Sequence, residues 1–149
     1  MVDCFEHLPA PKTQPIAFAH RMAKIVEFHQ ISLILPTCEE VFHLAAAAQG
    51  KAWGDKLYAP PLDDLLTLHD KGRFNTLVAQ TAPAFAPEFH RLESRAAREA
   101  VRGKDWVFKP CFSRVGTDTL ICPDDTQRSA IEPTVEVPWI AQRYLPGEE

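Results

Sequence analysis

Proline restricts the fold of this chain more than any other residue type, because the 149 residues contain 13 prolines and only six glycines. Each proline fixes its own φ angle and removes a backbone N–H donor, so it tends to end helices and strands or to sit in turns. The prolines are distributed along the whole chain, with no low-complexity tract. The sequence therefore predicts short helices and strands joined by stiff turns.

The composition predicts a folded cytoplasmic protein. Hydrophobic residues make up 46% of the chain, which is enough for a core, and the formal net charge of −4 argues against a general nucleic-acid or membrane-surface binder. No apolar run approaches the ~20 residues of a membrane span, and the N-terminus lacks the pattern of a signal peptide. The four cysteines lie far apart, which favours reduced thiols over a disulfide framework.

The first part of the chain has a helix–strand–helix pattern. Pro15 stands where the first turn of a helix tolerates proline, and apolar residues then recur at helical spacing up to Val26. The apolar run ISLILP, residues 31–36, is typical of a strand buried on both faces. Thr37 is a candidate cap for a following helix. Glu39 and Glu40 in its first turn interact favourably with the helix dipole or, alternatively, face a cleft at the end of the strand. This order is typical of a doubly wound α/β layer.

Three further helices are predicted between residues 60 and 105. A short helix covers Asp63–Leu68, and a second begins after Asp70, whose carboxylate can cap it. Residues 81–89 contain two prolines and are expected to form an extended connection. Ser94 then caps a charge-rich helix that ends near Gly103.

The C-terminal part changes to β-like composition. Three short strands are predicted in WVFKP (106–110), TLIC (119–122) and WIAQRYL (139–145), with a turn-rich connection between the last two. We therefore expect an α/β fold whose second half is α+β. The predicted division lies near residue 69, with an α/β segment at 1–69 and a smaller lobe, a short antiparallel sheet with helices, at 70–149.

Lys109 is the residue of this region that most invites a functional interpretation. Strand alternation places Trp106 and Phe108 on one face and Val107 and Lys109 on the other. The loop after the strand supplies hydroxyls, a second cation and a flexible Gly116, so its N–H groups and Lys109 can bind a phosphate. The alternative is a lysine whose stem lies on apolar surface while its ammonium stays in water.

Four segments in this order resemble the ATP-grasp superfamily, which includes biotin carboxylase and carbamoyl phosphate synthetase. They are LILPTCEEVFHLA, similar to the end of the Rossmann-like domain that precedes the grasp lobes, and LHDKGRF, VFKPCFSRVGT and WIAQRYLPGEE, similar to the first lobe. The resemblance extends over nearly the whole chain. It implies a partial pre-ATP-grasp domain followed by the first ATP-grasp lobe.

The resemblance also implies an ATP-binding role for individual residues. Lys71 corresponds to a lysine that reaches the ATP phosphates, and Lys109 to the strand lysine near the α-phosphate and adenine. The loop from Ser113 to Thr117, with Arg114 and Gly116, corresponds to the segment that closes over the β- and γ-phosphates. The adenine hinge corresponds to Gln142, Arg143, Tyr144 and Leu145, and the ribose-binding glutamate to Glu149, with Glu148 as the second choice.

The sequence departs from the family pattern at several points. Its loop contains less glycine than is usual, and Gln142 stands where the hinge often has a glutamate, although an amide can still accept from the adenine amino group. The lobe that supplies the Mg²⁺-binding carboxylates is not in this sequence, so we expect a fragment that does not catalyse the family reaction alone. No catalytic or metal-ligating residue is assigned here.

The functional expectation is therefore the ATP-binding portion of a ligase that activates a small carboxylate as an acyl phosphate for attack by an amine or thiol. Its expected partners are ATP, with Mg²⁺ held by the second lobe, the carboxylate substrate, and either that lobe or an oligomer. Nucleic acids and membranes are not expected partners. The alternative is a non-catalytic nucleotide-binding or interaction module. The scattered histidines and the three tryptophans are expected to be structural.

Overall fold

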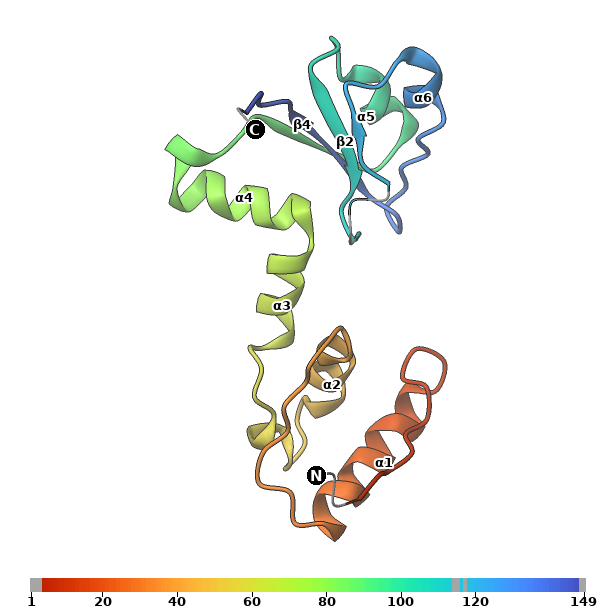
Figure 1. Ribbon diagram of the computed structural model, residues 1–149, viewed down its shortest axis with the longest axis vertical. Helices are drawn as coiled ribbons and strands as arrows, with labels where there is room; N and C mark the ends of the chain where they lie inside the picture. The colour runs from red at the N-terminus through yellow and green to blue at the C-terminus, as the bar shows by residue number, and fades with distance from the viewer. Residues whose placement is uncertain (1–3, 114–115, 117, 148–149) are drawn as a thin grey trace. The chain divides into compact units, whose positions relative to one another are not determined.

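The structure is a computed structural model that describes residues 4–113, 116 and 118–147. Within those residues the fold is mixed α/β, with six α-helices and one four-stranded antiparallel sheet. The chain divides into two compact units, Met1–Leu66 and Thr67–Glu149, and the whole sheet belongs to the second (Figure 1).

The first unit is built around two helices, α1 (Pro15–Phe28) and α2 (Glu40–Ala48), which pack against each other. The prediction that Pro15 lies in the first turn of a helix is confirmed. The apolar stripe of α1 and the apolar face of α2 meet around the buried indole of Trp53. The buried side chains of this core are Phe18, Met22, Val26, Leu44, Ala48 and Trp53.

The prediction of a fully buried strand at residues 31–36 is wrong. The only bridge in this segment joins Ile34 to Leu57, while Leu33 and Leu35 are 52% and 60% exposed. A buried strand needs a hydrogen-bonded neighbour on each side. The described part of the first unit provides one isolated bridge instead of a sheet, so the apolar run is an extended segment.

The predicted cap at Thr37 is also wrong. Helix α2 begins at Glu40, and the Glu40 carboxylate accepts hydrogen bonds from the backbone N–H of Thr37 at 2.7 Å and of Cys38 at 3.0 Å. These hydrogen bonds lower the pKa of Glu40. The glutamate therefore closes the turn by reaching back along the chain, a role that the threonine hydroxyl was predicted to fill.

The predicted helix starts in the second half of the chain are confirmed. The short helix is α3 (Leu62–His69), which contains the division between the two units. The Asp70 carboxylate caps α4 (Lys71–Thr81), and the Ser94 hydroxyl caps α5 (Arg95–Ala100). In both caps a side-chain oxygen accepts hydrogen bonds from N–H groups of the first turn. The local sequence is therefore sufficient to predict where these helices start.

The sheet contains the three predicted strands and one that was missed. Its order is β1-β4-β2-β3, with all pairs antiparallel; the strands are β1 (Phe89–Leu92), β2 (Trp106–Pro110), β3 (Leu120–Ile121) and β4 (Trp139–Arg143). Strand β1 has charged residues in its short FHRL sequence and is defined by its pairing with β4. The segment predicted to be a turn-rich connection contains helix α6 (Asp125–Ser129). The sequence does not reveal this helix, because five residues are too few for helical periodicity.

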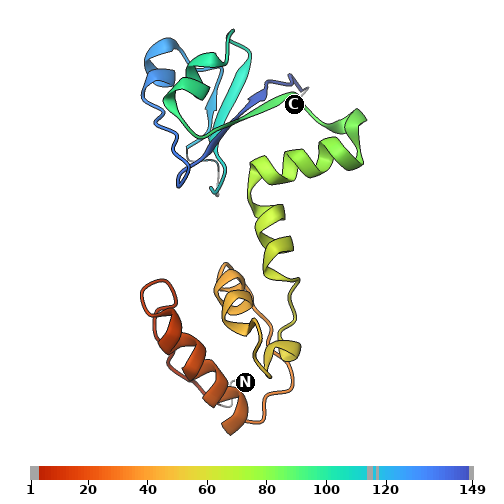
Figure 2. The same cartoon turned by 180° about the vertical axis from the view of Figure 1, so that it is seen from behind.

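One face of this sheet is covered by the core of the second unit. Trp106, Phe108 and Ala141 pack there with Leu92, and Val101 and Ile131 complete the cluster. Helices α5 and α6 group together beside the strands in both views, apart from α4 (Figures 1 and 2). The Lys109 side chain lies on the opposite face of the sheet.

Candidate functional site

The candidate site lies on the sheet face that carries Lys109. Opposite residues of antiparallel strands share a face, and the register pairs Lys109 with Ile140 and Val107 with Gln142. We call the side of the sheet that carries Val107, Lys109, Ile140 and Gln142 the lysine face. Alternation along β2 had predicted that Lys109 points away from Trp106 and Phe108, and the register confirms it.

A partly buried ion pair attaches the start of helix α4 to this face of the sheet. Arg91 of β1 is paired with Ile140, so it too lies on this face, and its Nη1 donates to both carboxylate oxygens of Asp70 at 2.9 Å. Asp70 is only 1% exposed. The carboxylate also accepts from the backbone N–H of Gly72 and Arg73, so one side chain caps the helix and joins it to the sheet.

Lys71 follows this cap directly and contacts the loop after β2. Its backbone N–H donates to the Cys111 carbonyl at 3.1 Å. Its Nζ donates to the Ser113 carbonyl at 2.8 Å and to the Ser113 hydroxyl at 3.1 Å. The helix start therefore holds the first residues of the loop that the sequence analysis associated with phosphates.

The two lysines are close enough to influence each other electrostatically. Burial lowers the pKa of Lys109, and the positive charge of Lys71 lowers it further. Burial also lowers the pKa of Lys71, although the negative charge of Asp70 acts in the opposite direction. No carboxylate of the described residues forms an ion pair with Lys109. The two ammonium groups are thus near enough to repel each other, and Lys109 has no anionic partner in the described part of the chain.

Cys111 lies next to Arg91 and Lys71 and is not a candidate nucleophile. It is 0% exposed, and burial together with the Asp70 charge raises its pKa to about 11. Only the thiolate is a strong nucleophile. The Cys111 side chain is therefore a buried, protonated packing element at neutral pH.

The other end of the lysine face is apolar. Val107 is paired with Ile121 of β3 as well as with Gln142, and Gln142 is paired with Phe89 of β1. Ile121 is 62% exposed, and Val107 and Phe89 are partly exposed. The Gln142 amide is thus surrounded by accessible hydrocarbon. Its partner Val107 lies two residues along β2 from Lys109, which is roughly 7 Å at the usual rise of a strand.

The expected adenine hinge is divided between the two faces. Gln142 lies on the lysine face, but Arg143 is paired with Trp106 and lies on the other, where its guanidinium is 5.5 Å from the Trp106 ring centroid. The backbone N–H groups of Arg143 and Tyr144 already donate to the backbone carbonyl oxygens of Glu88 and Asp105. Among the described residues of this hinge, Leu145 is 66% exposed and its N–H forms no backbone hydrogen bond.

Three of the predicted site residues, Arg114, Thr117 and Glu149, lie outside the described residues, as does the second choice Glu148. In the same loop Gly116 has a φ of +71°, in the left-handed region that glycine adopts readily. The structure therefore brings together Lys71, Lys109 and Ser113, with Gln142 on the same face. It places the Arg143 side chain apart from them.

Sequence reasoning missed Arg91, which positions this site through Asp70. Asp70 was identified as a helix cap from its place before the helix. Nothing in the local sequence distinguishes Arg91 from the other arginines, because its role arises only when β1 pairs with β4 beside the start of α4.

Within the described ranges, no three His, Cys, Asp or Glu side chains are grouped so that they could hold a metal ion. None of the helices in those ranges is long and apolar enough to cross a bilayer. No protein-family model matches the chain, and no curated protein matches it.

Proposed function

We propose that the second unit binds a nucleoside triphosphate on the lysine face, as the first lobe of an ATP-grasp ligase. The observation that carries this proposal is the electrostatic proximity of Lys71, from the start of α4, to Lys109, from β2, on a face where no described carboxylate pairs with Lys109. Keeping two ammonium groups close together is unfavourable unless an anion neutralises them.

The layout of the face supports a nucleotide over a simple anion. The cations lie at one end, next to the loop that begins with Ser113, and the apolar surface of Val107 and Ile121 lies at the other, beside the Gln142 amide. A purine ring requires an apolar surface and a few polar groups, whereas its phosphates require cations and N–H donors. The distance between the two ends is one that a nucleotide can span.

Lys71 has a specific part in this proposal. In the free chain its Nζ is held by Ser113, so it keeps the loop start near the face. A phosphate that binds Lys109 also competes with the Ser113 carbonyl for the ammonium group of Lys71. We therefore expect nucleotide binding to loosen the Lys71–Ser113 contact while the backbone bond from Lys71 to Cys111 stays in place.

Calorimetry with ATP and Mg²⁺ on the full chain tests the proposal. Removing a charge-assisted contact costs about 1.5–3 kcal/mol, so Lys109→Ala should weaken ATP binding about 10-fold or more. Lys12→Ala removes the same charge from an exposed position of the first unit and should leave the affinity unchanged. Equal affinity in the parent, Lys71→Ala and Lys109→Ala proteins would refute the assignment of both lysines.

The ligase reaction itself is a broader proposal. In the superfamily that the sequence resembles, Mg²⁺ is held by carboxylates of a second lobe, and the described residues offer no group of three metal-binding side chains. What is proposed for these residues is therefore the binding and orientation of the nucleotide. The carboxylate substrate and the nucleophile are assigned only by chemical class.

A further inference from the structure

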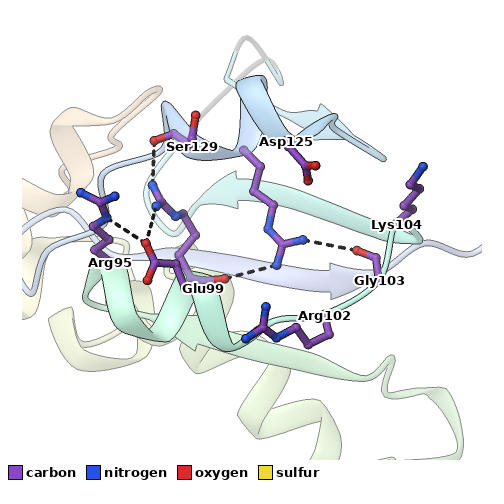
Figure 3. Close-up of a pocket in the computed structure, with 9 residues that line it drawn as sticks. Arg95, Glu99, Arg102, Gly103, Lys104, Asp125 and Ser129 are labelled. Atoms are coloured by element: carbon purple, nitrogen blue, oxygen red, sulfur yellow. Dashed lines mark hydrogen bonds and ion pairs between the residues drawn. The ribbon is translucent and has the colours of Figure 1, made fainter.

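The second unit contains a pocket that the proposed nucleotide site does not use. It lies between α5 and α6, on the sheet side opposite the lysine face, and has a volume of about 490 Å³ (Figure 3). Five cationic side chains and two carboxylates line it, although the whole protein has a formal net charge of −4. The local excess of positive charge is therefore a property of this pocket and not of the surface in general.

One end of the pocket is electrically satisfied and structural. Glu99 accepts from Arg95 at 2.8 Å and from Arg98 at 3.2 Å. Arg98 is only 4% exposed and donates to the carbonyl oxygens of Ser129 and Ile131, so it joins α5 to the end of α6. Arg98 therefore holds the walls together, and the Glu99 carboxylate already pairs with both arginines at this end.

The other end presents three cations with no carboxylate bound to them in the described part of the chain: Arg102, Lys104 and Arg128. The Arg128 guanidinium lies 5.4 Å from the centroid of the Phe108 ring and donates to the carbonyl oxygens of Gly103 and Arg98. These contacts restrain the guanidinium, while its remaining N–H groups donate to no other acceptor among the described residues. A guanidinium whose orientation is already fixed loses little entropy when it binds an oxyanion.

Arg102 and Lys104 belong to the turn between α5 and β2, which lines the same pocket as Arg128. Gly103 between them has a φ of +90°, and the Trp106 indole N–H donates to the Arg102 carbonyl at 2.7 Å. The labelled side chains of Arg102 and Lys104 extend from either side of Gly103, with Asp125 on the facing segment (Figure 3). The turn therefore presents two cations at one mouth of the pocket.

We propose that this end of the pocket binds the dianionic phosphate group of a phosphorylated small molecule. The three cations at this end supply the charge, and the guanidinium of Arg128, restrained by two backbone carbonyls, supplies its remaining N–H donors to phosphate. The volume is in the range of small-molecule sites. A nucleic acid fits less well, because it requires an extended basic track and these cations are bounded by Glu99 and Asp125.

Nuclear magnetic resonance of the full chain with phenyl phosphate tests this assignment. Saturable amide shifts are expected at residues 102–104 and 125–128, and benzenesulfonate, which has the same ring and one charge fewer, should bind more weakly. Shifts on β2 around Lys109 alone, or no saturable shift at all, would overturn the proposal. A phosphoserine peptide that binds here when phenyl phosphate does not would overturn the small-molecule assignment.

Variants separate this pocket from general charge effects. Arg102→Ala/Lys104→Ala should weaken phenyl phosphate binding at least 10-fold, and Asp125→Asn should strengthen it about twofold to threefold because a facing negative charge is removed. The control Lys12→Ala/Lys24→Ala removes two exposed cations of the first unit and should change nothing. Circular dichroism confirms that each variant is folded. Equal affinity in the parent and Arg102→Ala/Lys104→Ala proteins would contradict the proposal.

Discussion

The Asp70 carboxylate accepts two hydrogen bonds of 2.9 Å from a single nitrogen of Arg91, although the two residues are 21 positions apart in the sequence. The contact joins the cap of α4 to strand β1 and places Lys71 next to the lysine face. It is the point at which the stability of the second unit and the geometry of its candidate site depend on the same side chains.

Asp70→Ala should lower the free energy of unfolding by about 2–4 kcal/mol, because it removes a helix cap and leaves Arg91 without its buried partner. The loss is smaller than for a fully buried ion pair, because the Arg91 side chain is 32% exposed and water can solvate it. Asp124→Ala is the matched control, since Asp124 caps α6 without such an ion pair, and should cost about 1 kcal/mol. Urea unfolding followed by tryptophan fluorescence measures both. Equal losses would mean that the ion pair contributes nothing beyond the cap.

The stability that Asp70 provides should depend on pH in a defined way. Burial raises the pKa of Asp70, but the hydrogen bonds from Arg91, Arg73 and Gly72 and the Arg91 charge outweigh it, so the pKa lies below its usual value of 3.8. A carboxyl group with a lowered pKa stabilises the fold fully above its unfolded value and loses this effect as the pH falls through the folded value. The stability difference between the parent and Asp70→Asn proteins should therefore be constant from neutral pH to about pH 4 and shrink below it. A difference that grows with acid would contradict the sign.

Gly72→Ala should destabilise the protein even though alanine favours helices. A Cβ at this position would lie 2.5 Å from Arg91 Nη1 and 3.1 Å from Asp70 Oδ1. Arg91 can move away only by giving up the ion pair, so we expect a net loss of about 1–3 kcal/mol despite a gain of up to about 1 kcal/mol in helix propensity.

A double-mutant cycle isolates the cause of that loss. In an Arg91→Ala background, Gly72→Ala should become neutral or stabilising, because the clashing guanidinium is gone. Gly147→Ala, where nothing lies within 4 Å of the added Cβ, serves as the control. If Gly72→Ala costs the same in both backgrounds, the steric account is wrong.

Cys111 should resist thiol reagents in the folded protein. It is 0% exposed and its pKa is raised to about 11, whereas Cys4, Cys38 and Cys122 are exposed. A colorimetric thiol assay at about pH 8, near the usual thiol pKa, should detect three reactive thiols in the native state and a fourth after denaturation. Cys111→Ala should leave the native count unchanged and remove the late thiol. Fast modification of all four would show that the site opens readily.

Nucleotide binding should weaken at alkaline pH earlier than expected for an ordinary lysine. Burial lowers the pKa of both Lys71 and Lys109 below 10.5, and only the protonated ammonium attracts phosphate. ATP affinity should therefore be constant at low and neutral pH and fall as the pH rises through these lowered values. Titrations in the parent and Lys109→Arg proteins check this, because arginine stays charged throughout. An equally steep fall in the arginine variant would assign the effect to another group.

Short-range chemistry made several features predictable from the sequence. Pro15, Asp70 and Ser94 mark helix starts because the φ angle of a proline, or a side-chain oxygen beside the first N–H groups, acts within one turn. The alternation of WVFKP placed Lys109 opposite Trp106 and Phe108 because successive side chains of any strand point to opposite faces. These rules need no knowledge of the remote chain.

Pairing between distant segments decided the rest. The apolar run at 31–36 satisfies every local criterion of a buried strand, yet it forms one bridge because no neighbouring strands flank it in the described part of its unit. Strand β1 carries little apolar signal and exists because β4 pairs with it, which in turn brings Arg91 to Asp70. Likewise, the sequence identified Lys71 and Lys109 separately. Their proximity, and the contact of Lys71 with Ser113, 42 positions away, arise from the packing of α4 beside the sheet, because hydrogen bonds and burial between remote segments are set only when the chain has folded.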